Sequence, residues 1–400
     1  MLVDLYDIIC TIDRTVYITG SISTTVVILI AYLSYKLYMP SDLLTDMSCK
    51  QWNPRQLDRY SEDELPLSQP FGWFAVLDSE VLNKNETKSV SLFEHDLVVY
   101  RGESGLVHVL DTYCPHNGAN LGVGGTVVGD CIRCPFHCWK FNSKGKCTEI
   151  PGLDANSIPN IETRVWQCME MDNLIMVWYH PNNQKPDWLP FPCELMVKDK
   201  FEYRGKCNLI ANCCIQEFSE NAADFAHFNT VHLPTEVLGI VKWKGMGAKL
   251  WDWITKHVYY KWTPLSYDVY PSPNGHMSIQ ITSATYHAFG RIFAEFTIDM
   301  LQIGPALAHV TTKYTLFGMD FSTILVTTIT PLGPYRNSFC HRLYMKPGFL
   351  RRVFAKIFIK TVVIMLSRDV MIWNDKKYLR KSLFKKNENS LVKFRRWYKQ

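Results

Sequence analysis

The first apolar segment of the chain has the length of a membrane-spanning helix. Twenty-one uncharged residues, TVYITGSISTTVVILIAYLSY, lie between Arg14 and Lys36. As a helix rising about 1.5 Å per residue they cover roughly 30 Å, the thickness of a bilayer's hydrocarbon core. Bulky Leu, Tyr and Met follow, rather than the small residues of a signal-peptidase site. The pattern predicts an uncleaved N-terminal membrane anchor over residues 1–39, with its helix at about 15–36.

Short alternating runs broken by Gly, Asn and Asp fill the next part of the chain. SLFEHDLVVYRGESGLVHVLD is typical of a β-hairpin with Gly-Glu-Ser-Gly as its turn. A polar, Pro-bearing linker over residues 40–69 precedes this part, and the Pro-rich segment NNQKPDWLPFPC follows it. We expect a small antiparallel β domain over residues 70–181.

The remaining chain mixes helical and strand patterns. NCCIQEFSENAADFAHFNTVH and FLRRVFAKIFIKTVVIML are typical of helices. HMSIQITSATYHAFGRIFAEFTIDMLQIG and AHVTTKYTLFGMDFSTILVTTITPL predict long strands. A sheet with helices packed against it makes the fold class α+β, with the second domain over residues 190–385.

Positive charge is concentrated in two places. From Lys376 to Gln400 there are ten Lys/Arg and one Glu, whereas the rest of the chain has 33 basic and 37 acidic residues. Aromatic residues lie among these cations, which suits an anionic membrane surface or an acidic redox partner. The alternative is a solvated basic tail over residues 386–400. No recognition motif accompanies the charge, so we do not expect nucleic acid as a partner.

The second basic region is the helix predicted from FLRRVFAKIFIKTVVIML. Helical spacing places Arg352, Lys356 and Lys360 on one face. Such a helix suits the membrane interface near the point of substrate entry, and a domain helix with one wet face is the alternative. Basic residues follow the predicted anchor and acidic residues precede it, which predicts that the bulk of the chain faces the cytosol.

Two Cys/His pairs form the first candidate site. Cys114 and His116, then Cys134 and His137, give the pattern C-x-H…C-x-x-H, with 17 residues between the pairs. A structural zinc could use these ligands, but zinc sites usually pair like ligands. Mixed pairs on two Pro-bearing loops favour a Rieske [2Fe–2S] centre, with two thiolates on one iron and two imidazoles on the other.

The surrounding sequence resembles the Rieske domain of Rieske-type non-haem iron oxygenases. GLVHVLDTYCPHNGANLG and IRCPFHCWKFNSKGKCTEIP carry the resemblance, which covers roughly residues 70–180. It implies that Cys114, His116, Cys134 and His137 hold the cluster. It also implies a second, catalytic domain of the helix-grip type with an antiparallel sheet.

QEFSENAADFAHFNTVHLP contains the second candidate site. His227 and His232 are five residues apart, about 140° around an ideal helix, so they converge only if the helix ends between them. Asn229, Thr230 and the later Pro234 favour such an ending. The segment resembles the D-x₂-H-x₄-H motif of Rieske oxygenases, which implies that both histidines hold a mononuclear Fe(II).

The third iron ligand and a bridging carboxylate follow from the same resemblance. SRDVMIWND is similar to the D-x-x-I segment of the family, which places the third ligand on Asp369, with Asp375 as the other candidate. Two imidazoles and one carboxylate leave positions open for O₂ chemistry. In the family, the Asp three residues before the first iron histidine links it to a Rieske histidine of the neighbouring subunit. That role falls to Asp224 and implies a homotrimer.

Nearly the whole chain after residue 40 looks like the Neverland-type cholesterol 7-desaturases, which are related to bacterial 3-ketosteroid 9α-hydroxylases. The resemblance implies conversion of cholesterol to 7-dehydrocholesterol in steroid hormone biosynthesis, using O₂ and electrons that a separate reductase or ferredoxin brings from NAD(P)H. It further implies a single-pass protein of the endoplasmic reticulum membrane. Two alternatives stay open: a Rieske monooxygenase that hydroxylates another steroid or lipid, and a membrane-anchored Rieske electron carrier.

Overall fold

The computed structural model describes most of the chain after residue 36. The described residues are 37–48, 69–232, 253, 257–316, 318–333, 335–379, 383–384 and 388–399. The predicted anchor helix and most of the 40–69 linker lie outside them. Within the described part, no helix combines the length and apolar character needed to cross a bilayer.

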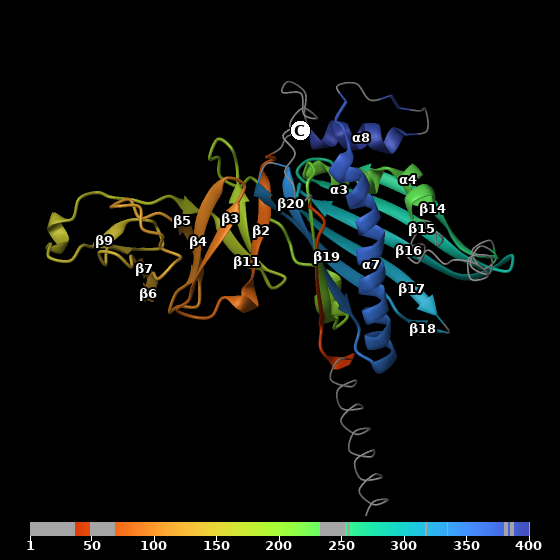
Figure 1. Cartoon of the computed structure of the whole chain (residues 1–400), viewed down its shortest axis with the longest axis horizontal. Coiled ribbons are helices and arrows are strands. Elements are labelled where there is room, and N and C mark those ends of the chain that lie inside the picture. The colour runs from red at the N-terminus through yellow and green to blue at the C-terminus, as the bar shows by residue number, and fades with distance from the viewer. Residues whose placement is uncertain are drawn as a thin grey trace, which may run out of the picture.

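Small antiparallel sheets build the N-terminal half of the molecule (Figure 1). One sheet contains β3 (Thr87–Leu92), β4 (His95–Arg101), β5 (Val107–Asp111) and β10 (Val165–Trp166). A second contains β2 (Gly72–Asp78), β11 (Cys168–Met171) and β12 (Leu174–Tyr179). The third contains β6 (Thr126–Val128), β7 (Cys131–Arg133), β8 (Lys140–Phe141) and β9 (Cys147–Glu149). The predicted hairpin is confirmed, since β4 pairs with β5 across the Gly-Glu-Ser-Gly turn.

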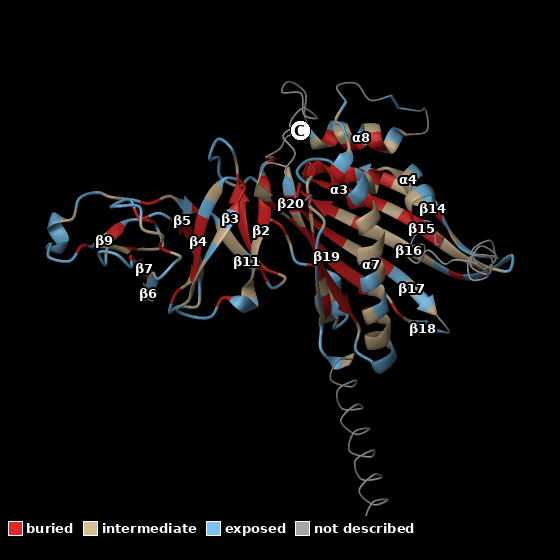
Figure 2. Cartoon of the chain, in the orientation of Figure 1, coloured by how far each residue is buried: buried red, intermediate tan, exposed pale blue. Residues whose placement is uncertain are grey.

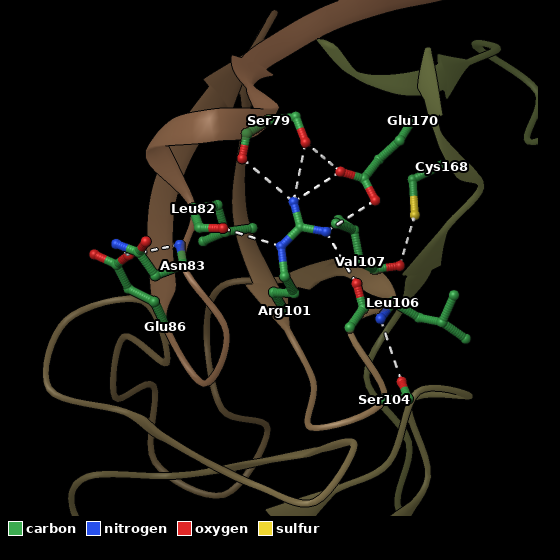
Figure 3. A network of polar contacts seen from close by, with 11 residues as sticks. Ser79, Leu82, Asn83, Glu86, Arg101, Ser104, Leu106, Val107, Cys168 and Glu170 are labelled. Atoms are coloured by element: carbon green, nitrogen blue, oxygen red, sulfur yellow. Dashed lines mark hydrogen bonds and ion pairs between the residues drawn. The ribbon is translucent and has the colours of Figure 1, made fainter. Parts of the chain in front are cut away.

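One guanidinium fastens the first two of these sheets to each other (Figure 3). Arg101, at the end of β4, donates from Nε to the Leu82 carbonyl at 2.9 Å. Its Nη1 donates to the Gly105 carbonyl at 2.9 Å, and its Nη2 donates to Ser79 Oγ at 3.0 Å. It also forms a two-pronged ion pair with Glu170 of β11, at 2.9 and 2.7 Å. The hydrogen bonds from Arg101 lower the pKa of Glu170. Each nitrogen of the guanidinium donates to an acceptor in this network.

A single large sheet forms the C-terminal half. Its order is β1-β13-β20-β19-β17-β16-β15-β14, with β18 paired to β17. The strands are β1 (Ser41–Asp46), β13 (Glu202–Ala211), β14 (Val258–Val269), β15 (Met277–Ala288), β16 (Arg291–Ile303), β17 (Leu307–Leu316), β18 (Met319–Asp320), β19 (Thr323–Gly333) and β20 (Arg336–Met345). The long strands predicted from the two alternating segments are therefore confirmed as β15 to β19.

Strand β1 differs from the expectation that residues 40–69 form only a linker. It pairs in parallel with β13, from Ser41 opposite Gly205 to Asp46 opposite Ile210, whereas every other pair of neighbours is antiparallel. Gly205 has φ +139°, and a Cβ there would lie 2.2 Å from the Ser41 carbonyl oxygen. Glycine at this position therefore permits the close approach of β1.

Helices lie on one face and one end of the large sheet (Figure 1). The helix predicted from FLRRVFAKIFIKTVVIML is confirmed as the first part of α7, which crosses the sheet. The helices are α2 (Glu194–Lys198), α3 (Gln216–Ala223), α4 (Phe225–Val231), α7 (Phe349–Asp375) and α8 (Asn389–Tyr398), besides the 3₁₀ turns η2 (Ser79–Val81) and η3 (Ala155–Ser157).

The segment expected to be a basic tail is a packed helix. Leu391, Phe394 and Trp397 of α8 are buried. Arg395 pairs with Glu220 of α3 at 2.6 Å, and Lys393 donates to Asp268 of β14 at 2.7 Å. Because its apolar stripe and these cations are used within the chain, α8 belongs to the fold of the second domain.

Alternation along β20 shows what covers each face of the large sheet. Arg342 points toward the N-terminal half, where its Nε donates to Asp78 of β2 at 3.0 Å. The odd-numbered residues point the other way, and the Phe339 ring lies 5.6 Å from that of Trp373 in α7. Successive side chains of a strand face opposite sides, so both faces of β20 are covered and nearly every residue is buried (Figure 2).

Candidate metal centres

The C-x-H…C-x-x-H residues lie on two loops of matching geometry. In each loop the cysteine N–H donates to the carbonyl five residues later, and the N–H four residues later donates back to the cysteine carbonyl. These distances are 2.9 and 2.9 Å at Cys114 and 2.8 and 3.2 Å at Cys134. The fourth residue after each cysteine has positive φ, 69° at Gly118 and 58° at Cys138. The two loops therefore share one backbone conformation, and only the first has glycine at its left-handed position.

The two loops hold their thiols inward and their imidazoles outward. Cys114 and Cys134 are both buried. Burial raises the pKa of Cys114 to about 11, and the adjacent Cys134 thiol adds to the effect. His116 and His137 are exposed, with ring centroids 4.6 Å apart. Two adjacent thiols below two adjacent imidazoles are the donor set that fits a Rieske cluster, which has thiolates on one iron and imidazoles on the other.

A break between two short helices positions the second site. Asp224 ends α3 and caps α4, and its carboxylate accepts a hydrogen bond from Ala226 N–H at 3.1 Å. The backbone carbonyl of Asp224, in turn, accepts a hydrogen bond from Nδ1 of His227. This contact fixes the His227 ring and leaves Nε2 for another partner.

The expected helix ending is confirmed, and it brings both histidines to one place. Helix α4 ends at Val231, so His232 takes the cap position with φ −104° and ψ 31°. The ring centroids of His227 and His232 lie 5.1 Å apart. The ending comes one residue later than Asn229 and Thr230 suggested.

Asp369 of α7 completes the group. Its Oδ2 lies 3.3 Å from His232 Nε2, and one ligand atom from each of His227, His232 and Asp369 lies within 4.8 Å of the others. Asp375, the other candidate, is exposed at the end of α7 and outside this group. The structure therefore brings together the three residues chosen from the sequence.

The surroundings of this triad fit a metal cation. Asp369 is 2% exposed. Among the described residues, its Oδ1, His227 Nε2 and His232 Nδ1 are buried without a hydrogen-bond partner. A buried carboxylate with an unused oxygen is costly unless a cation compensates it. Burial lowers the pKa of His227, which favours the neutral imidazole that binds metal. Two imidazoles and a carboxylate with open positions are the ligand set of non-haem Fe(II) sites.

The triad lies at one end of a cavity between α7 and the large sheet. The cavity has a volume of about 350 Å³, within the range of small-molecule sites. Along α7 its lining runs from Phe354 to Asp369, which corresponds to about 22 Å of helix. Most of its wall is apolar, from Phe228, Trp262, Phe296, Ile298, Met300, Val310, Leu325, Phe358, Val362, Met365 and Leu366.

A few buried polar groups interrupt this wall, and the sequence reasoning missed them. Gln280 and Thr282 of β15, Thr312 of β17, and Thr327 and His341 of neighbouring strands line the cavity. Burial lowers the pKa of His341 to about 3, so its imidazole is neutral at physiological pH. Polar residues at alternating positions of apolar strands were the available signal, but only the register of the sheet makes them neighbours.

Comparison with protein families matches nearly all of the described chain. The Rieske [2Fe–2S] domain family matches residues 72–166. The family of the 3-ketosteroid 9alpha-hydroxylase C-terminal domain matches residues 177–400. The Rieske match agrees with the ligand set of the two loops and decides against the zinc alternative.

Curated relatives cover most of the chain. Cholesterol 7-desaturase nvd of Xenopus laevis is 35% identical over 86% of this chain and 74% of its own length. Cholesterol 7-desaturase nvd of Drosophila melanogaster is 35% identical over 84% of this chain and 76% of its own length. The oxygenase component of 3-ketosteroid-9-alpha-monooxygenase from Rhodococcus rhodochrous is 27% identical over 82% of this chain and 80% of its own length.

Solved structures show the same fold at lower identity. Dicamba monooxygenase bound to dicamba is 14% identical, with a TM-score of 0.61 over 84% of this chain and 97% of that one. The arrangement of a Rieske domain and an antiparallel catalytic sheet is therefore confirmed. The family assignment made from the motifs is also confirmed. The chain belongs to the Rieske-type non-haem iron oxygenases, an enzyme family, and within it to the group of the cholesterol 7-desaturases.

Proposed function

We propose that this protein is a cholesterol 7-desaturase. It removes two hydrogens from cholesterol to give 7-dehydrocholesterol, while O₂ and NAD(P)H with one proton yield two waters and NAD(P)⁺. The relatives named cholesterol 7-desaturase, aligned over more than four fifths of the chain, carry this conclusion. A long, mostly apolar cavity that ends at the His227, His232 and Asp369 triad is the matching structural observation.

Each site residue receives a role from its position. Cys114, His116, Cys134 and His137 hold the [2Fe–2S] cluster, and His227, His232 and Asp369 hold a mononuclear Fe(II). When bound, the iron supplies O₂ activation, and the cluster supplies electrons one at a time.

The protein's own part is positioning and exclusion of water. The aromatic and aliphatic walls of the cavity bind the apolar body of a sterol and keep water from the triad. The Asp224 carbonyl holds the His227 ring in place, so that His227 Nε2 stays directed toward His232 and Asp369. A substrate held along α7 presents one carbon–hydrogen region to the triad, which is the requirement for a regioselective reaction.

We further propose that electrons pass between subunits. In one chain, the β6 to β9 sheet with its Cys134 loop lies at the end of the molecule remote from α4 (Figure 1). A homotrimer that brings the imidazoles of one chain next to Asp224 of another shortens this path. The Asp224 carboxylate is only half-buried, so a neighbour can reach it.

Replacement of Asp224 by Asn tests this bridge. Both metal sites should stay occupied, because neither the N-terminal cap of α4 nor the metal ligands depend on the negative charge of Asp224. Reoxidation of the reduced cluster in the presence of O₂ and substrate should slow markedly. Stopped-flow absorbance of the cluster measures that rate, and sedimentation velocity measures the trimer. Normal reoxidation in the variant would remove Asp224 from the path.

For location, we propose a single-pass protein of the endoplasmic reticulum membrane. Residues 15–36 form its anchor and the catalytic domains face the cytosol. The uncharged stretch and the excess of basic residues after it support this orientation. Protease protection of the anchored protein in microsomes tests it, since cytosolic domains are digested without detergent.

The decisive experiment supplies purified protein with cholesterol, NADPH and a ferredoxin–reductase pair. A conjugated 5,7-diene, detected by its ultraviolet absorption and by mass, is the expected product. A product heavier than cholesterol by one oxygen would instead establish the hydroxylase alternative, which the Rhodococcus rhodochrous relative represents.

A His232→Ala variant is the matched control. It should lose diene formation and the mononuclear iron but keep the Rieske absorption spectrum, because its site is separate from the two cluster loops. If the wild-type protein binds only the two irons of the cluster, the electron-carrier alternative is correct and the assignment of the triad fails.

A further inference from the structure

An exposed apolar surface lies at the N-terminal end of α7, away from both metal centres. We call it the apolar end and define it by Tyr38, Met39, Phe349 and Leu350. These side chains are 55%, 43%, 58% and 52% exposed. A group of large apolar residues at the surface marks an interaction site more often than isolated ones do.

Contacts hold the two segments of the apolar end side by side. The Arg352 guanidinium lies 4.7 Å from the centre of the Tyr38 ring. Lys356 donates to the Met39 carbonyl, and to Ser41 Oγ at 3.1 Å. Residues 38–41 are therefore fixed against the first turns of α7, at the lower end of the molecule in Figure 1.

The cavity of the second domain opens close to this surface. Ile357 lines the cavity and is also 61% exposed, so the cavity reaches the surface at this residue. Leu350 and Ile357 are seven residues apart and therefore share one side of α7, about 10 Å from each other along the helix. From Ile357 the lining continues along α7 to Asp369, about 18 Å further.

Both the charge around the apolar end and the sequence that precedes it fit a lipid bilayer as partner. Residues 346–360 contain five Lys/Arg and no acid. Several of these cations have partners, such as Glu202 near Arg352 at 3.3 Å, but Lys360 is exposed. Basic residues around exposed apolar side chains suit the headgroup region of an anionic bilayer. The uncharged stretch of 21 residues between Arg14 and Lys36 ends just before Tyr38.

We infer that the apolar end rests in the interfacial layer of a lipid bilayer, and that sterol passes from the bilayer into the cavity past Ile357. The inference rests on the proposed function and adds the route by which its substrate arrives. An apolar sterol then avoids crossing water, because the mouth of the cavity lies about two helical turns from the immersed side chains.

The test compares two ways of delivering cholesterol to the full-length protein. Cholesterol is supplied either in phosphatidylcholine–phosphatidylserine vesicles or as a soluble cyclodextrin complex. A Phe349→Asp/Leu350→Asp variant should lose at least tenfold in kcat/KM with vesicles and keep wild-type kcat/KM with cyclodextrin. Neither residue lines the cavity, so the soluble route is left intact.

Two further variants complete the comparison. Leu189→Asp changes an equally exposed leucine, 65% exposed, in the segment between the domains, and should behave as wild type with both deliveries. Phe349→Trp/Leu350→Trp keeps the surface apolar and should retain vesicle activity.

Equal kcat/KM of the aspartate variant and wild type with vesicles would overturn the inference. Equal losses with both deliveries would overturn it as well, because they indicate damage to the fold or the cavity rather than to entry. Absence of diene from the wild-type protein with either delivery would instead refute the proposed function.

Discussion

A largely buried carboxylate links the Rieske domain to the catalytic sheet through two cations. Asp78, at the end of β2, accepts from Lys206 Nζ of β13 at 2.6 Å and pairs with Arg342 of β20. The three side chains are 11%, 19% and 10% exposed. Replacing Asp78 with Asn keeps the shape of the side chain but removes the negative charge beside buried Arg342 and half-buried Lys206.

The expected cost can be worked from this geometry. Removing one partner of a buried ion pair destabilises a protein by about 3–5 kcal/mol. Asparagine still offers one acceptor oxygen, so we expect the lower end, about 3 kcal/mol. Asp42→Asn is the matched control, since Asp42 lies 3.8 Å from the same Lys206 but is 67% exposed. An exposed pair of this kind contributes less than about 1 kcal/mol.

Urea titration followed by tryptophan fluorescence gives the free energy of unfolding for the three proteins. The stability that Asp78 contributes also depends on pH. Burial alone raises the pKa of Asp78, but Arg342 and Lys206 together lower it below its ordinary 3.8. The carboxylate's contribution is therefore complete above about pH 5 and is lost as the pH falls below 4. A loss in Asp78→Asn no larger than in Asp42→Asn at pH 7 would refute this account of the domain contact.

Three other sites give further tests, the first two measured by thermal or urea unfolding and the third by amide hydrogen exchange. Cys138→Gly should stabilise the Rieske domain slightly, because relief of strain at a φ of 58° outweighs the freedom that glycine adds to the unfolded chain. Gly118→Ala, at a φ of 69°, should cost more than about 1 kcal/mol. Phe394→Ala should cost about 3–5 kcal/mol, because this ring of α8 is 1% exposed, while exposed Arg396→Ala should change little; equal effects would mean that α8 is dispensable. Gly205→Ala should detach β1, because its Cβ would lie 2.2 Å from a backbone oxygen, and rapid amide exchange across residues 41–46 would report it.

Local patterns in the sequence account for much of both candidate sites. The mixed Cys/His pairs predict two loops, and the structure gives these loops matching hydrogen bonds at Cys114 and Cys134. The spacing of His227 and His232 requires a helix ending, and α4 ends at Val231. These predictions succeed because the signal and the structure both lie within a few neighbouring residues.

Features that depend on distant partners were not predictable in this way. Strand β1 is six residues long and pairs with β13, more than 160 positions later. Helix α8 looked like part of a solvated tail because the ten Lys/Arg from Lys376 to Gln400 outnumber its three buried apolar residues. The spacing of Arg352 and Lys356 predicts only a shared helix face, and it does not show that they contact Tyr38 and Met39. In each case the deciding partner is remote in sequence.

The pairing of β1 has a mechanical consequence. The strand begins at Ser41, and six residue pairs join it to β13 at the edge of the catalytic sheet. Residues 37–40, which lead into β1, are therefore held at the edge of the catalytic sheet through these six pairs. A pull on these residues is therefore resisted by the backbone hydrogen bonds between β1 and β13.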